Sequence, residues 1–253
     1  MKSFLLTCLV LLNLSVTFAQ TEAERFKKDQ LKSKYLSEKE FKDQLIKHNF
    51  SSLVTHTDNS MVYGFIGDNY QRIRIKFITV TKDAVSPDTY HIYGKSMVKN
   101  NVDEFRGTIT ISNIRKLKVT SYGVDDEYKN KGIKGEFVII GDYSFAEAEQ
   151  QNHSGFFKGI FKSGFYLDKS NKVRYDDIES NADGYTNNQF VGQWIDYKTK
   201  IAKRCNWGDF RVPNSSDLDM GAGEFSPSDK YLKYGWQSLR EHDEKVENAK
   251  WWQ

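Results

Sequence analysis

The chain has 253 residues, 14% of them aromatic, and its 37 basic side chains nearly balance its 34 acidic ones, for a net charge of +3. This balance argues against a nucleic-acid-binding protein, which needs a concentrated basic face to neutralise phosphates. The length fits one domain with appendages, and the aromatic residues supply material for a hydrophobic core.

Residues 1–19 have the composition of a secretory signal peptide. They contain one basic residue, Lys2, then an apolar run over 4–14, and end on the small residue Ala19. The apolar run is too short for a transmembrane helix, so we expect cleavage before Gln20. No later segment is apolar enough to cross a membrane as a helix. The sequence therefore predicts a secreted protein, either periplasmic or associated with the cell surface of a bacterium.

Residues 20–52 carry charges of both signs and a narrow apolar stripe, which indicates helix. Within them, Ser37-Glu-Lys-Glu40 is a capping-box pattern and predicts a helix that begins there and runs to about His48. We expect this helical segment to lie against the next domain or to close its end, and a partner-binding arm is the alternative.

From Met61 onwards, apolar residues recur at every second position, as a half-buried strand requires. The predicted strands cover residues 61–66, 70–81, 90–99, 105–111, 133–140, 156–167, 189–197 and 201–210, with an irregularity near Asn113 before a continuation at 115–121. Eight successive strands with no helix between them are typical of an antiparallel up-and-down barrel, or of a sandwich. We predict an all-β barrel over residues 60–212.

A Phe-x-Gly pattern recurs in three of these strands, as Phe105-Arg-Gly107, Phe157-Lys-Gly159 and Phe190-Val-Gly192. A glycine inside a strand lowers stability unless the backbone bends sharply or a neighbouring aromatic side chain covers the gap. The pattern therefore predicts a strongly curved sheet with aromatic rings packed over its glycines.

With Tyr63-Gly64, Gly94 and the Gly-x-Trp at Gly192-Gln-Trp194, these motifs over roughly residues 61–210 resemble the meander of calycin-type barrels. That group includes lipocalins, avidins and small secreted bacterial barrels. In lipocalins a Gly-x-Trp marks the first strand, whereas here it lies near the last. The resemblance implies a barrel that can hold one ligand at its mouth.

Residues 213–253 change character after Val212-Pro213. Gly, Asp and Ser dominate 214–225, and Ser226-Pro227-Ser-Asp229 has the cap and first-turn proline of a helix that runs towards Asn248, with a weak point at Gly235. We expect a polar loop followed by a C-terminal helix packed on the barrel.

Four residues near the last strands are candidates for ligand binding. Trp194 and Trp207 offer flat rings for stacking, and Asp209 and Arg211 alternate at a strand end, where both could face the barrel mouth as polar anchors. The alternatives are that the tryptophans belong to the core and that the two charges form a structural salt bridge.

Asp217-x-Asp219, with Glu224 nearby, is a candidate calcium loop, because closely spaced carboxylates suit hard cations. The EF-hand pattern is incomplete, since Gly221 and Ser228 stand where it requires acidic or amide ligands. The alternative is a turn held by Asp side chains. The same acidic block could also supply the paired carboxylates of a glycoside hydrolase.

The sequence contains no P-loop, Gly-x-Ser-x-Gly or Cys-x-x-Cys motif, and its five histidines lack metal-ligand spacing. Cys205 has no histidine near it in sequence and is expected to be buried and inert. The sequence thus predicts no cofactor and favours a protein that is not an enzyme.

Three functional hypotheses follow. The first is a secreted, non-enzymatic binding protein that holds a small apolar or glycan-like ligand at the barrel mouth. The alternative is a structural or protein-interaction module of the cell envelope whose barrel is filled. A hydrolase that uses the acidic block after Pro213 is the third. An internal cavity lined by Trp and Tyr favours the first hypothesis, and a solid core favours the second.

Overall fold

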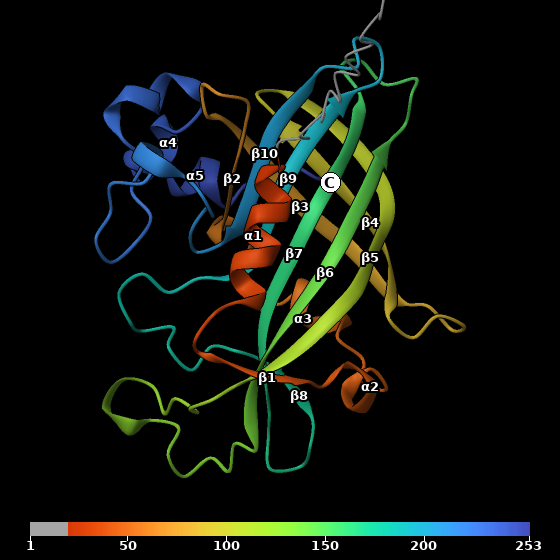
Figure 1. Ribbon diagram of the computed structural model, residues 1–253. Coiled ribbons are helices and arrows are strands. Elements are labelled where there is room, and N and C mark those ends of the chain that lie inside the picture. Colours follow the sequence, from red (N-terminus) through yellow and green to blue (C-terminus); the bar gives the residue numbers. More distant parts are fainter. Residues whose placement is uncertain (1–19) are drawn as a thin grey trace, which may run out of the picture.

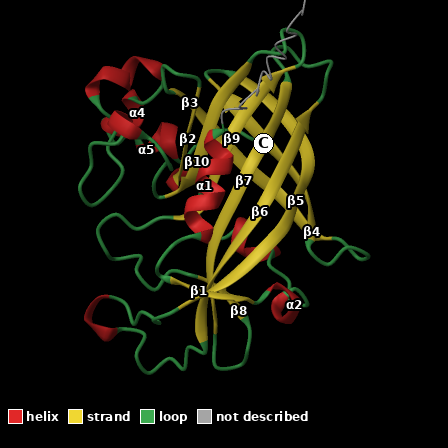
Figure 2. Cartoon of the chain, viewed as in Figure 1, coloured by secondary structure: helices red, strands yellow, loops and turns green. Residues whose placement is uncertain are grey.

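The computed structural model describes residues 20–253, so the predicted signal peptide lies outside the described residues. Eight antiparallel strands close into a barrel (Figures 1 and 2). They are β2 (Val62–Ile66), β3 (Gln71–Lys82), β4 (Thr89–Val98), β5 (Asn101–Leu117), β6 (Gly135–Glu147), β7 (Gly155–Leu167), β9 (Asn187–Asp196) and β10 (Ala202–Asp209). Each pairs with the next along the chain, and β10 returns to β2. The predicted all-β up-and-down barrel is confirmed, and the sandwich alternative is excluded.

The predicted irregularity in the fourth barrel strand is a shift of register within β5. The pairing of β5 with β6 moves by one residue between Ile111 and Asn113, and the strand continues to Leu117. Such a bulge bends a strand and increases its twist, which helps a sheet to close on itself.

Neighbouring strands pack closely against the strand glycines inside the barrel. Gly94 lies opposite Phe105, and Gly107 lies opposite Phe145. A Cβ atom added to Gly192 would come within 2.6 Å of the hydroxyl oxygen of Tyr143. For the glycines of the Phe-x-Gly pattern the closest neighbour is backbone: a Cβ atom on Gly107 would lie 1.9 Å from the Ser144 carbonyl oxygen, and one on Gly159 would lie 2.2 Å from that of Val191. The predicted close packing is present at these glycines, but neighbouring backbone causes it more than aromatic rings do.

The barrel interior is filled. Its largest buried side chains include Phe105, Phe145, Phe157, Phe165, Phe190 and Trp207 on the strands, together with aliphatic residues. Two cavities inside the barrel have volumes of about 20 and 10 Å³. Each is the size of a single water molecule at most, so neither can hold an organic ligand.

The N-terminal segment covers one outer face of the barrel and one of its ends. Helix α1 (Glu22–Leu31) is capped by Thr21 and packs its Phe26 against the outside of β6, β7 and β9 (Figure 1). The short helices α2 (Lys42–Leu45) and α3 (Ser51–Val54) follow, and the side chains of Leu45 and Leu53 enter the main core.

The prediction of a helix that begins at Ser37 is wrong. Residues Leu36–Glu40 form strand β1, which pairs with the end of β5. The Glu40 carboxylate accepts hydrogen bonds from the backbone N–H groups of Ile114, at 2.8 Å, and Lys42, at 2.7 Å. The acidic residue of the capping box thus caps a strand junction, and long-range pairing outweighs the local helix signal.

The prediction of a single long helix after Ser226 is also wrong. The chain instead forms three short segments, η4 (Asp229–Tyr234), α4 (Gln237–Arg240) and α5 (Glu244–Glu247). Gly235 adopts a φ of 96° between the first two, at the predicted weak point. The segments pack on the outside of β2 and β3, seen at the left of Figure 1.

Buried residues of this second core are Tyr63, Phe65, Tyr70, Val212, Leu218, Phe225, Tyr231 and Trp236. The remaining short elements are β8 (Val173–Tyr175), which pairs with β7, and the 3-10 turns η1 (Asn59–Met61), η2 (Val124–Asp126) and η3 (Ser216–Leu218). Along residues 20–253, no helix is long and apolar enough to span a membrane.

Candidate functional site

Trp207 lies inside the barrel. Its side chain is 1% exposed, and its ring stacks on that of Phe190 with centroids 4.7 Å apart. The rings of Tyr143 and Phe157 pack against it edge-on. This is the core position that the sequence offered as the alternative to ligand stacking.

Trp194 lies towards the opposite end of the barrel, where β9 ends. Its indole Nε1 donates a hydrogen bond of 2.9 Å to the Glu147 carboxylate, and the Lys203 ammonium group covers the ring at 5.4 Å. Ser96 and the backbone N–H of Gly155 also donate to Glu147. Burial raises the pKa of Glu147 to about 7 although these bonds favour the ionised form. Trp194 is therefore a hydrogen-bond donor in a buried polar cluster near the barrel mouth.

Asp209 ends β10 and is buried at the barrel end that α3 covers. Its Oδ2 atom accepts hydrogen bonds from Thr57 at 2.6 Å, Tyr175 at 2.8 Å and Asn188 at 2.7 Å. Burial raises the pKa of Asp209 to about 7, against the effect of these three hydrogen bonds. The carboxyl group joins the segment after α3, strand β8 and strand β9, and so closes this end of the barrel.

We predict that Asp209→Asn makes stability less dependent on pH. The folded protein retains the Asp209 proton up to about pH 7, whereas the unfolded chain loses it near 3.8, so wild-type stability falls as pH rises through this interval. The amide cannot ionise, and the variant should gain about 3 kcal/mol relative to wild type between pH 4.5 and pH 8. Urea denaturation at both pH values measures the gain.

The exposed Asn69 provides the control, because an amide does not titrate and Asn69→Ala removes no ionisable group. If the profiles of wild type and Asp209→Asn stay parallel, Asp209 is ionised in the folded protein at neutral pH and burial does not raise its pKa to about 7.

Arg211 points away from Asp209, towards the loop after η3. Its guanidinium group forms an ion pair of 2.8 Å with Asp219 and donates hydrogen bonds to the backbone carbonyls of residues 221–224. The second oxygen of Asp219 accepts the N–H groups of Gly221 and Ser226. The structure therefore separates Asp209 from Arg211, and Arg211 forms a structural salt bridge that shapes a loop.

The carboxylates of the predicted calcium loop bind other side chains. Asp217 accepts hydrogen bonds from Lys230 and Tyr231, while Asp219 is paired with Arg211. In the part of the chain that the structure describes, no three His, Cys, Asp or Glu residues are grouped to hold a metal ion. The geometry is that of a turn held by Asp side chains, and it gives no support to a calcium site or to a catalytic carboxylate pair.

The structure reveals a surface hollow that we call the C-terminal cleft, with a volume of about 580 Å³. It lies between the C-terminal segments, the loop before β9 and the loop that Arg211 shapes. Its half-buried apolar lining is Met61, Tyr185, Phe210 and Leu239, and its exposed polar lining includes Glu224, His242 and Glu244. Tyr185 and Phe210 pack together with ring centroids 5.0 Å apart.

Phe210 has a backbone conformation that is uncommon for a large side chain. Its φ is 65°, in the left-handed region, directly after the last barrel strand. The turn moves the chain out of the barrel wall and places the ring in the cleft beside Tyr185. Backbone strain of this kind is concentrated at functional sites, and it supports the cleft as the candidate site.

A buried ion-pair network holds one wall of the cleft. Glu247 of α5 binds Arg72, at 2.5 Å, and Arg74, at 3.0 Å, and accepts a hydrogen bond from Ser238. Burial alone would raise the pKa of Glu247, but the bonds and charges of its partners outweigh it and lower the pKa. The carboxylate therefore fixes α5 against β3.

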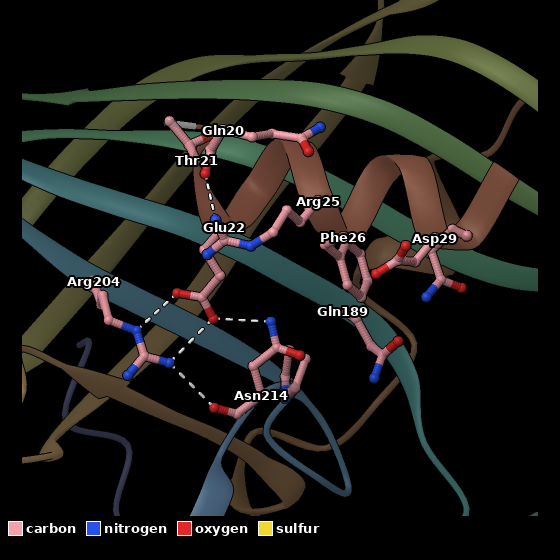
Figure 3. A pocket seen from close by; sticks show the side chains of 11 residues that line it. Gln20, Thr21, Glu22, Arg25, Phe26, Asp29, Gln189, Arg204 and Asn214 are labelled. Carbon is pink, nitrogen blue, oxygen red and sulfur yellow. Dashed lines mark hydrogen bonds and ion pairs between the residues drawn. The ribbon is translucent and has the colours of Figure 1, made fainter. Parts of the chain in front are cut away.

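A second hollow, of about 860 Å³, lies beside the start of α1 (Figure 3). At its centre, Glu22 forms an ion pair of 2.7 Å with Arg204 and accepts hydrogen bonds from Asn206 and Asn214. Burial acts to raise the pKa of Glu22, but these hydrogen bonds lower it overall. Its charged groups are thus occupied in anchoring α1, which makes the C-terminal cleft the better candidate.

Sequence analysis assigned Glu224 to the candidate residues but gave no role to Tyr185, Phe210 or His242. Phe210 stands between Asp209 and Arg211, inside the unusual block that drew attention to them. The cleft draws its lining from five separate stretches of the chain, and no spacing in the sequence brings these together.

Comparison of the chain with protein-family models, with curated proteins and with solved structures gives no match. The resemblance to calycin-type barrels therefore stays a prediction, and the function has to be argued from the geometry of the described residues.

Proposed function

We propose that the chain is a secreted, non-enzymatic binding protein that holds a small glycan-like ligand in the C-terminal cleft. The observation that carries this proposal is the contrast in volume, about 580 Å³ in the cleft against 20 Å³ or less in the cavities within the barrel. Ligand pockets usually measure about 300–1,000 Å³ and combine apolar walls with a few polar groups. The proposed ligand site therefore lies on the outer surface of the barrel and not at its mouth, where the sequence analysis placed it.

The lining supports a neutral, hydroxyl-rich ligand. Phe210 and Tyr185 present apolar ring surface to the apolar face of a sugar, while the tyrosine adds a polar handle. Glu224 and Glu244 at the rim can accept hydrogen bonds from sugar hydroxyls, and His242 can donate one or accept one. Arg240 also lines the cleft, but its guanidinium group is engaged by Asp229 and by the Pro227 carbonyl, so the acidic side chains of the rim disfavour an anionic ligand.

The alternative is a cell-envelope structural or protein-interaction module, and the filled barrel favours it. In that case the cleft receives a peptide segment of an envelope protein, and the acidic rim selects basic residues in it. In both hypotheses the binding site lies on the outer surface, and the filled barrel acts as a rigid support for it.

Phe210→Ala is predicted to weaken ligand binding at least about tenfold, because burying one aromatic ring against a ligand contributes more than about 1.4 kcal/mol. A glycan array with the mature wild-type protein identifies the ligand, and isothermal titration compares the variants. Tyr93→Ala is the matched control, since Tyr93 is a half-buried aromatic residue on the outside of β4. It should bind as wild type does.

Circular dichroism checks that both variants fold. Equal affinity of Phe210→Ala and wild type would remove the cleft from consideration. A wild-type protein that binds no glycan but binds basic peptides, with loss in Phe210→Ala, would replace the glycan proposal with the interaction module.

A further inference from the structure

The wall of the 20 Å³ cavity inside the barrel combines apolar side chains, such as Val54, Ile75 and Phe190, with several polar ones. Asn188, Trp207 and Asp209 contribute to it, and Thr57 closes it from the segment that follows α3. The cavity lies beneath the hydrogen bonds that Asp209 receives from Thr57 and Asn188. It is distinct from the C-terminal cleft and plays no part in the proposed function.

Two buried polar atoms of this wall have no hydrogen-bond partner among the described residues. They are the indole Nε1 of Trp207, a donor, and the side-chain Oδ1 of Asn188, an acceptor. Both residues are nearly inaccessible, at 1% and 2% exposure. Buried polar groups in folded proteins are almost always satisfied, so each of these atoms points to a bound group.

The two hydrogen bonds that the Asn188 side-chain nitrogen donates fix the orientation of its amide group. Nδ2 donates to the Leu53 carbonyl at 2.8 Å and to Asp209 Oδ2 at 2.7 Å, and both of these oxygens are acceptors. Exchanging the amide oxygen and nitrogen would place oxygen against oxygen at both contacts. Oδ1 is therefore an acceptor that needs a donor from elsewhere.

The unpaired donor and the unpaired acceptor in the cavity wall restrict which group can bind there. The indole N–H needs an acceptor and would repel a cation, whereas Asn188 Oδ1 needs a donor and would repel an anion. The occupant must therefore donate and accept, and it must fit a volume that holds a single water molecule. We propose that one water molecule binds here, accepts the indole N–H of Trp207 and donates to Oδ1 of Asn188.

Its second hydrogen is left for another polar group of the wall, which also includes Thr55, Asn59 and the Asp209 carboxyl group. The water then joins the network of Thr57, Tyr175 and Asn188 around Asp209 and completes the hydrogen bonding at this end of the barrel. Such a water exchanges only when the end of the barrel opens, and its residence time is long compared with that of surface hydration.

Nuclear magnetic resonance of the mature protein, labelled with ¹⁵N, tests the proposal. The Trp207 indole proton should show a cross-peak to water with the sign of a long-lived contact in paired NOE and ROE spectra. Trp236 is the internal control, because its indole donates to the Tyr70 carbonyl at 2.8 Å and it is equally buried. It should show no such cross-peak.

Oxygen-17 magnetic relaxation dispersion provides the second measurement. Trp207→Phe removes the donor and keeps a ring in the core, and it should lose the contribution of one long-lived water. A missing cross-peak at Trp207 in the wild type overturns the proposal even if the variant fails to fold. Unchanged dispersion in a folded Trp207→Phe overturns it as well.

Discussion

Replacing Trp207 with alanine is expected to lower the free energy of unfolding by about 3–5 kcal/mol. The ring is 1% exposed and stacks on Phe190 in a barrel whose interior is otherwise occupied by side chains. Strands tied to both neighbours by hydrogen bonds cannot collapse into the space, so the loss includes a cavity as well as the lost contacts. Urea denaturation followed by circular dichroism measures the change.

Trp251→Ala is the matched control, since this ring lies half-buried near the end of the chain. Its removal should cost less than about 1 kcal/mol. A loss below about 1 kcal/mol for Trp207→Ala as well would mean that the barrel interior is loosely packed. The hypothesis of a ligand inside the barrel would then regain support.

Glu247→Ala should destabilise the protein by about 3 kcal/mol or more, because it removes the shared partner of two buried guanidinium groups. The side chains of Arg72 and Arg74 are only 6% and 11% exposed, so neither can turn into water without disturbing the C-terminal segments. We expect α4 and α5 to detach first, which limited proteolysis would reveal as cleavage after η4.

Glu241→Ala changes an exposed acidic residue between the same two helices and should leave stability within about 0.5 kcal/mol of wild type. Because Glu247 also lines the C-terminal cleft, its variant should lose ligand affinity together with the protease resistance of the segment. Full stability of Glu247→Ala would contradict a buried network that holds the cleft wall.

The strands could be predicted because their signal is local. Alternation over 105–111 places Phe105, Ile109 and Ile111 on one face, and all three are buried inside the barrel. The glycines of the Phe-x-Gly pattern indicated close packing for a reason that belongs to the strand itself, namely the absence of a side chain. The sequence left open whether the strands close into a barrel or divide into a sandwich, because successive strands pair with one another in both architectures.

The terminal segments could not be predicted because their local and long-range preferences conflict. Ser37 to Glu40 has the residues of a helix cap, yet pairing with β5 and the binding of two backbone amides by Glu40 favour a strand. After Ser228, helix propensity is interrupted where Trp236 has to enter the outer core and donate to Tyr70. Both long-range interactions join residues that are far apart in the sequence, so an analysis of local sequence patterns cannot detect them.

The sequence by itself determined an all-β meander of eight strands and the inward face of those strands that alternate regularly, since both follow from a period of two. Only the tertiary structure decided whether the barrel is hollow or filled, because that depends on how the volumes of rings from different strands add up at its centre. It also separated Asp209 from Arg211 and assembled the cleft around Phe210 from distant stretches. Alternation along one strand assigns a side chain to a face, but the neighbours it meets there are set by the closure of the whole barrel.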